Sequence, residues 1–217
     1  MFCTRTESRL LDVAIDQFGR CGITGASTRA IAREAQTPMS SITYYFGGKE
    51  GLYCAAAERV AEQLTLHIQP ILNESDQVFG KDGDTAAARL AIQLILKRIA
   101  EIMVDPDTTT IARFIVREQI APESSFTRLG KGPFGPVIER LSALVRRLAG
   151  GRMSKDEAHI RGIALCTHVL VSKLVHDQTM AEAGNPQAAV GKIATAHYVI
   201  EDHLSAICDR LERMNTE

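Results

Sequence analysis

The chain has 217 residues and a net charge of −1, and these properties, together with its composition, argue against several classes of protein. Hydrophobic residues make up 45% of the chain and charged residues 24%, which is ordinary for a globular protein. No run approaches the ~18 apolar residues of a membrane-spanning helix, and the N-terminus lacks an apolar signal core. Five cysteines without CxxC spacing argue against a disulfide framework or a zinc ribbon. We therefore expect a cytoplasmic protein without a membrane partner.

The first 52 residues are nearly neutral, with six basic and five acidic side chains. A protein that binds nucleic acid mainly by neutralising phosphates is more basic than this. Any DNA binding by the region must therefore depend on where individual groups point. A symmetric dimer would help, because it doubles every contact.

The N-terminal region predicts three short helices. Residues 4–7 form a capping box, apolar residues follow at helical spacing, and Gly22 ends the first helix. Two further helices are expected at about residues 28–35 and 38–45.

The second and third of these helices are joined by a tight turn at Gln36 and Thr37, an arrangement that places a helix in the DNA major groove. We expect Thr28 to cap the second helix and Pro38 to open the third, where its missing N–H is harmless. The third helix ends at Gly47 and carries no charge. Its hydroxyl groups can bond base edges and phosphates, so this segment predicts DNA binding.

The rest of the chain is predicted to be helical, with no β-strand pattern, so the fold class is all-α with about nine helices. We expect a long helix from Lys49 to about residues 70–73 and shorter helices at about residues 85–104, 107–120 and 137–148, before two long C-terminal helices. We place the domain boundary between a DNA-binding domain at residues 1–48 and a larger domain at residues 49–217.

The last two helices have a pattern typical of helices that associate. A second capping box at residues 154–157 opens the first of them. Mostly apolar residues share one face of that helix and recur every 3.5 residues in the next. They are Ile160, Ile163, Ala164, Thr167, Leu170, Val171 and Leu174, then Val190, Ile193, His197, Ile200, Leu204, Ile207 and Leu211. A two-fold four-helix bundle between subunits accounts for this pattern, and packing within one chain is the alternative.

About residues 5–55 resemble the DNA-binding domain of the TetR family of transcriptional regulators. The most specific part is Ile42–Tyr53, which is similar to the family's aromatic-rich recognition helix followed by a Lys-Glu pair. Phe114–Gln119 resembles the CecR-like branch of the family. Two positions depart from the family pattern: Gln36 replaces a turn glycine, and Pro38 stands where a Ser is common. A left-handed backbone at Gln36 would cost on the order of 1–2 kcal/mol.

The resemblance implies a homodimeric regulator with a helix-turn-helix domain and a larger effector-binding and dimerisation domain. We interpret the chain as a repressor that binds a near-palindromic double-stranded DNA operator and is released by a small molecule; an activator is the alternative direction. The side chains expected at base edges are Met39, Ser40, Thr43 and Tyr44, and those expected at phosphates are Thr28, Tyr45 and Lys49. Arg29 is expected at a base or a phosphate and Arg5 in the minor groove, while Ile42 and Phe46 should anchor the recognition helix.

An effector must enter between helices of the larger domain, in an apolar cavity with a few polar groups. The candidate effector-binding residues are Phe114, Arg117, Glu118, Phe126, His168 and Ser172. The alternative for Arg117 and Glu118 is a structural role, in salt bridges that hold residues 121–135. The sequence does not identify the effector.

Signals of an enzyme or a metal site are weak, so we expect no catalytic activity, cofactor or metal. Residues 130–135 match GxGxxG, but no strand precedes them, and Pro133 disfavours a phosphate site. The histidines lack the close ligand spacing of a zinc site. Buried structural roles are expected for Cys21 and Cys54, with redox sensing as the alternative. A helical small-molecule-binding protein or enzyme with an unused DNA-binding domain is the rival interpretation of the whole chain.

Overall fold

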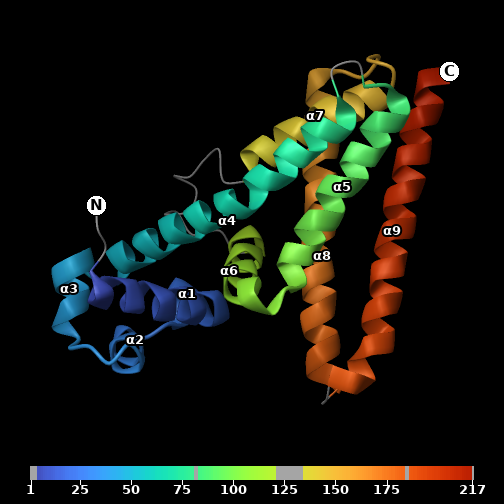
Figure 1. Ribbon diagram of the computed structural model, residues 1–217. Coiled ribbons are helices and arrows are strands. Elements are labelled where there is room, and N and C mark those ends of the chain that lie inside the picture. The colour runs from blue at the N-terminus through green and yellow to red at the C-terminus, as the bar shows by residue number, and fades with distance from the viewer. Residues whose placement is uncertain (1–3, 81–82, 121–133, 184–185, 217) are drawn as a thin grey trace. The chain divides into compact units, whose positions relative to one another are not determined.

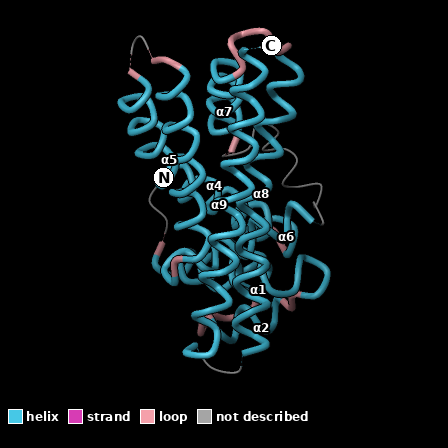
Figure 2. The backbone as a smooth tube through the Cα atoms, turned by 90° about the vertical axis from the view of Figure 1, so that its right-hand side faces the viewer, coloured by secondary structure: helices cyan, strands magenta, loops and turns pink. Residues whose placement is uncertain are grey.

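The computed structural model describes residues 4–80, 83–120, 134–183 and 186–216, and every regular element in these ranges is a helix (Figure 1). The elements are α1 (Arg5–Gly25), α2 (Thr28–Glu34), α3 (Ser40–Phe46), α4 (Lys49–Phe79), α5 (Thr85–Val104), the 3₁₀ turn η1 (Pro106–Thr108), α6 (Thr109–Ile120), α7 (Gly135–Leu148), α8 (Lys155–Ala183) and α9 (Pro186–Thr216). Figure 2 shows only helices and connecting loops in this part of the chain, which confirms the all-α prediction.

The helices pack into two compact units. The first unit comprises Met1–Leu66 and Pro106–Pro133, and the second comprises His67–Asp105 and Phe134–Glu217. The helix α6 therefore packs with the N-terminal helices, although about 60 residues separate it from α3 along the chain. These units are defined by packing, and the functional boundary between residues 48 and 49 stays a prediction.

The helix α1 starts and breaks where the sequence predicts. The Thr4 hydroxyl accepts a hydrogen bond from the Glu7 N–H, and the Glu7 carboxylate accepts one from the Thr4 N–H, which completes the capping box. Gly22 has a φ of 68°, which interrupts the helical backbone before a last turn to Gly25. Leu10 and Phe18 of α1 are buried in the core of the first unit.

The predicted cap of α2 and the predicted start of α3 are wrong by one and two residues. Ser27 caps α2, because its extended backbone lets the hydroxyl accept the Ala30 N–H at 3.4 Å. Thr28 is instead the first helical residue. The helix α3 begins at Ser40, and Pro38 lies in the turn before it. The Pro38 carbonyl accepts a hydrogen bond from the Ser41 N–H at 3.0 Å.

Gln36 adopts the left-handed backbone that its place in the turn predicts, with a φ of 54°. Its side-chain oxygen accepts a hydrogen bond from the Arg9 guanidinium at 2.9 Å. This contact between α1 and the turn offsets part of the cost of the unfavourable φ.

The prediction that the long helix ends near residues 70–73 is wrong, because α4 continues past Pro70 to Phe79. Contacts with α7 hold the extra turns in the second unit. The Arg140 guanidinium donates to the Ser75 hydroxyl at 3.2 Å, pairs with Asp76 at 2.8 Å and lies 5.2 Å from the centre of the Phe79 ring. These tertiary contacts offset the hydrogen bond that Pro70 removes.

In the second unit, α8 and α9 lie side by side and pack with α5 and α7 (Figure 1). Arg89 of α5 links to α9 by ion pairs with Asp209 and Glu212 at 2.5 and 3.2 Å. Leu204 and Leu211 of the predicted 3.5-residue repeat are buried within the chain itself. For these positions, intrachain packing is therefore what the structure shows.

The apolar face predicted for α8 is exposed at its N-terminal half. The side chains of Ile160 and Ile163 are 66% and 41% exposed, and Ala164 and Thr167 on the same face are also exposed. This face therefore differs from the buried part of α9.

Candidate DNA-binding surface and ligand cavity

The helix α3 presents an uncharged surface on a buried anchor. Ile42 is only 2% exposed and fixes the helix in the core of the first unit, and Phe46 is half-buried. The Tyr44 side chain is 83% exposed, and its ring lies edge-on against Tyr45 at 4.9 Å between centroids. Gly47, in the left-handed conformation, ends the helix.

The other base-contact candidates share this exposed surface. Met39, Ser40 and Thr43 are exposed, so the four residues predicted at base edges lie together at or beside α3. A rigid helix that carries exposed hydroxyl and apolar groups suits contact with base edges in a groove.

The phosphate-contact candidates differ in solvent exposure and in whether they already form a hydrogen bond. Thr28 is half-buried, whereas Arg29 beside it on α2 is exposed. Lys49 is half-buried, and its ammonium donates to the Thr24 carbonyl at 3.4 Å. Of the two cations, Arg29 is therefore more accessible than Lys49. The sequence predicted a phosphate contact for Lys49 but left open whether Arg29 contacts a base or a phosphate.

Three of the predicted effector residues lie in the packing of α6 against α1 and α4 in the first unit. Phe114 is buried and stacks on Tyr53 at 5.6 Å, and Tyr53 meets Phe18 edge-on at 5.0 Å. Glu118 is buried, and its carboxylate accepts a short hydrogen bond from the Tyr53 hydroxyl. The Arg117 guanidinium donates to the Arg20 carbonyl at 3.4 Å.

His168 belongs to the second unit instead. Its ring lies 5.7 Å from that of His203 on α9, and its buried Nε2 atom has no hydrogen-bond partner among the described residues. Burial lowers the pKa of His168, and the nearby His203 lowers it further. Phe126 and the Ser172 side chain lie outside the described residues. The structure thus places Phe114 and Glu118 at Tyr53, Arg117 beside α1, and His168 in the other unit.

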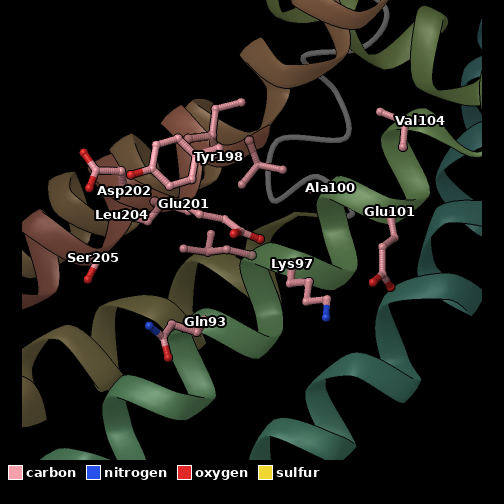
Figure 3. A pocket seen from close by; sticks show the side chains of 13 residues that line it. Gln93, Lys97, Ala100, Glu101, Val104, Tyr198, Glu201, Asp202, Leu204 and Ser205 are labelled. Carbon is pink, nitrogen blue, oxygen red and sulfur yellow. The ribbon is translucent and has the colours of Figure 1, made fainter. Parts of the chain in front are cut away.

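A cavity of about 530 Å³ lies between α5, α8 and α9 in the second unit (Figure 3). We call it the α5–α9 cavity. It is lined by Gln93, Leu96, Lys97, Ala100, Glu101 and Val104 of α5, Val169 of α8, and Tyr198, Ile200, Glu201, Asp202, Leu204 and Ser205 of α9. Its volume falls in the range of drug-sized ligand sites.

None of the four effector candidates whose side chains the structure describes, Phe114, Arg117, Glu118 and His168, lines the α5–α9 cavity. The sequence does carry a signal for one of its walls, because Leu96, Ala100 and Val104 recur every four residues on α5. That stripe does not reveal which distant helix faces it. Only the packing of α5 with α9 identifies the cavity.

The described residues hold no group of three or more His, Cys, Asp or Glu side chains that is placed to bind a metal ion. No helix among them is long and apolar enough to cross a membrane. The described cysteines are free thiols, and burial raises the pKa of the Cys166 thiol to about 12.

Solved structures share this fold. A TetR transcriptional regulator from Legionella pneumophila has a TM-score of 0.57 and 18% identity, covering 92% of this chain and 99% of that one. A putative transcriptional regulator from Pseudomonas aeruginosa PAO1 has a TM-score of 0.56 and 18% identity, covering 94% and 92%.

Sequence comparison is more specific. The HTH-type transcriptional dual regulator CecR of Shigella flexneri is 29% identical over 172 residues, which are 79% of this chain and 74% of that protein. The probable HTH-type transcriptional regulator YttP of Bacillus subtilis (strain 168) is 25% identical over 118 residues, 52% of this chain and 50% of that one.

Two family models match the chain. The model of bacterial regulatory proteins of the tetR family matches residues 10–56, which include α2 and α3. The model of the C-terminal domain of the HTH-type transcriptional dual regulator CecR matches residues 88–210, more than half of the chain. The chain therefore belongs to the TetR family of transcriptional regulators and carries a C-terminal domain of the CecR type.

Proposed function

We propose that this regulator is a repressor, which binds a near-palindromic operator as a homodimer and leaves it when a small-molecule effector binds. The observation that carries the proposal is the α3 surface, where Tyr44 and the hydroxyls beside it are exposed on a helix that Ile42 anchors in the core. A rigid helix holds its contact groups at fixed positions, so little entropy is lost when it binds.

Dimerisation through α8 and α9 would supply the two-fold symmetry. The exposed apolar face of α8, with Ile160 and Ile163, supports this part of the proposal, because a face of this kind is usually covered by a partner. Val199 adds exposed apolar surface on α9. In such a dimer, the two copies of α3 would enter successive major grooves about 34–36 Å apart.

The chemistry of α3 also predicts what the operator offers. Ser40–Phe46 contains no guanidinium, ammonium, amide or carboxylate side chain, so bidentate bonds to guanine or adenine cannot come from this helix. Thr43 and Tyr44 combine a hydroxyl with apolar atoms, and the thymine C5-methyl group is the apolar feature of the major groove. We therefore expect thymines at the centre of each half-site.

Contacts with the DNA backbone would position α3. Thr28, Tyr45 and Lys49 are assigned to phosphates, Arg29 to a phosphate or a base, and Arg5 to the minor groove. The exposure of Arg29 supports its part. Because the first 52 residues are nearly neutral, these few contacts must be placed accurately for binding to occur.

Effector binding would change the affinity for DNA through α4, because this helix carries residues of both compact units. Control of this kind requires the effector to bind two states of the protein differently, typically by 1–3 kcal/mol. Phe114, Arg117, Glu118, Phe126, His168 and Ser172 stay candidates for effector contact. The relative from Shigella flexneri is named a dual regulator, which makes activation a second candidate direction of control.

The test is binding of the purified protein to a fluorescent duplex that carries its own promoter region, compared with a scrambled duplex across a salt series. We expect saturation at one dimer per operator and an affinity at least ~10³-fold above that for the scrambled duplex. The same duplex with uracil in place of thymine in the half-sites should bind more weakly, because uracil lacks the methyl group. Equal, weak and salt-sensitive binding to all three duplexes would contradict the proposal.

A further inference from the structure

We propose that the α5–α9 cavity binds a bulky organic cation whose charge is held by Glu201 and Asp202 at the α9 wall. The inference deepens the proposed function, since it assigns a chemical class to the effector and a site that differs from the residues predicted from the sequence. It depends on the proposed function only for the consequence at the operator, because binding by the free protein can be measured without DNA.

The size and the walls of the cavity favour a largely apolar ligand. Its volume of about 530 Å³ exceeds what a small ion or a single amino acid needs. Leu96, Ala100 and Val104 form an aliphatic stripe on α5, and Val169 and Leu204 contribute further aliphatic surface from α8 and α9. Burying apolar ligand surface against these side chains is favourable in proportion to the area removed from water.

The charges at the cavity favour a cation over an anion. Glu201 and Asp202 are exposed and form no ion pair with any residue that the structure describes. Glu101 already has a partner, because its carboxylate pairs at 3.2 Å with Arg98, which it shares with Glu74. Lys97 is the opposing charge, so the carboxylates without a partner outnumber the ammonium group by two to one among the lining residues.

The direction of Glu201 strengthens the preference, whereas Asp202 extends away from α5 in Figure 3. In this view, Glu201 extends from α9 toward α5, whereas the ammonium end of Lys97 and the carboxylate of Glu101 extend away from α9. The ammonium group of Lys97 therefore lies away from the α9 carboxylates, where its repulsion of a bound cation is weakest.

Tyr198 supplies a surface for the cation itself. It is 69% exposed and lies one helical turn before Asp202 on α9, with its hydroxyl end toward that residue in Figure 3. An organic cation over the face of this ring gains a cation–π contact as well as attraction to the nearby carboxylates. Aliphatic walls, an exposed ring and two carboxylates without a partner therefore occur together at one cavity.

The experiment uses two probes of nearly the same size and opposite charge, tetraphenylphosphonium and tetraphenylborate. Binding of each to the full-length protein is measured by isothermal titration calorimetry in the absence of DNA. We expect the cation to bind with a Kd at least about tenfold lower than that of the anion. Equal affinities, tighter binding of the anion, or no binding of the cation would overturn the inference.

Variants then test the position of the site. The double variant Glu201→Gln with Asp202→Asn should raise the Kd of the cation at least about fivefold, while Lys97→Gln should lower it. Glu139→Gln on α7 is the matched control, because Glu139 is exposed in the same unit and does not line the cavity. If the double variant and the control bind the cation equally well, the assignment to this cavity is wrong. Circular dichroism and thermal unfolding confirm that each variant is folded.

The failure of this inference and that of the proposed function can be told apart. If the protein binds its operator specifically but prefers neither probe, the cation site is overturned and the regulator stands. If the cation binds at the cavity but leaves the affinity for the operator unchanged, the site stands and its role as the effector site fails.

Discussion

The exposed face of α3 and the aromatic packing between α1, α4 and α6 contain the same kinds of side chain but use them in opposite ways. Tyr44 is 83% exposed, whereas Tyr53, nine residues later, is 1% exposed and lies between Phe18 and Phe114. The hydroxyl of Tyr53 is bonded to the buried Glu118. The exposed ring of Tyr44 is therefore available to contact a partner. The buried rings of Phe18, Tyr53 and Phe114 stabilise the unit that carries it.

The largest expected effect is a loss of stability when the buried anchor of α3 is truncated, compared with truncation at its exposed face. Ile42→Ala removes buried aliphatic atoms and should lower the free energy of unfolding by about 2–5 kcal/mol. Thr43→Ala, at the exposed neighbouring position, should change it by no more than about 0.5 kcal/mol. Urea denaturation at one fixed protein concentration measures both. Equal losses in the two variants would show that α3 is not anchored through Ile42.

The second effect lies on the exposed face. Tyr44→Ala should weaken specific operator binding about 30-fold or more, because each of two half-sites loses a contact worth about 1–3 kcal/mol. The free energy of unfolding should stay within about 0.5 kcal/mol, since the ring contacts mainly solvent and Tyr45. Fluorescence anisotropy measures the binding, and sedimentation velocity measures the dimer. Loss of the dimer in this variant would contradict the assignment of Tyr44 to DNA.

A smaller effect is expected in the buried packing. Tyr53→Phe keeps the ring but removes the hydrogen bond to the Glu118 carboxylate, and should lower the free energy of unfolding by about 1.5–3 kcal/mol. The control is Tyr45→Phe, which removes a hydroxyl from an exposed ring and should leave stability unchanged. Chemical denaturation distinguishes them. If Tyr53→Phe is as stable as the parent protein, this hydrogen bond does not contribute to folding.

The smallest effect concerns pH and belongs to the second unit. Burial and the nearby His203 lower the pKa of His168, so the unfolded chain binds this proton more readily than the folded protein. The stability contributed by the neutral ring is therefore present above the unfolded pKa of about 6.5 and is lost as the pH falls through that value toward the lower folded pKa.

Thermal unfolding at pH 7.5 and pH 5.5 tests this dependence. His168→Asn should reduce the loss of Tm between the two pH values, whereas His67→Asn, at an exposed position of α4, should leave that loss as it is in the parent protein. Equal pH dependence in all three proteins would exclude a contribution from His168.

Local sequence patterns predicted the helices well, and tertiary contacts explain where the prediction was wrong. The capping box at Thr4 and the breaks at Gly22 and Gly47 depend on residues close together in the chain, and the structure shows them as predicted. The helix α4 was predicted too short, because Pro70 is a local signal to stop and the Arg140 contacts that outweigh it come from α7.

The candidate sites divide in the same way. The exposed surface of α3 was predictable, because Ile42 and Tyr44 lie within one turn of the same helix. Helix periodicity alone therefore places one side chain in the core and the other in solvent. The surroundings of Glu118 and the walls of the α5–α9 cavity were not predictable, because their partners lie 65 and about 100 residues away along the chain. Helix periodicity identifies an apolar or polar face but not the helix that meets it.

The sequence by itself determined the all-α class, the family, the cap of α1, the breaks at Gly22 and Gly47 and the uncharged surface of α3, because each depends on residues within a few positions of one another. Only the tertiary structure decided that α6 packs with the N-terminal helices, that Leu204 and Leu211 are buried within their own chain, and that carboxylates of α9 lie at a cavity beside α5. The physical reason is that burial and charge pairing depend on which distant helices meet, and local spacing does not encode that.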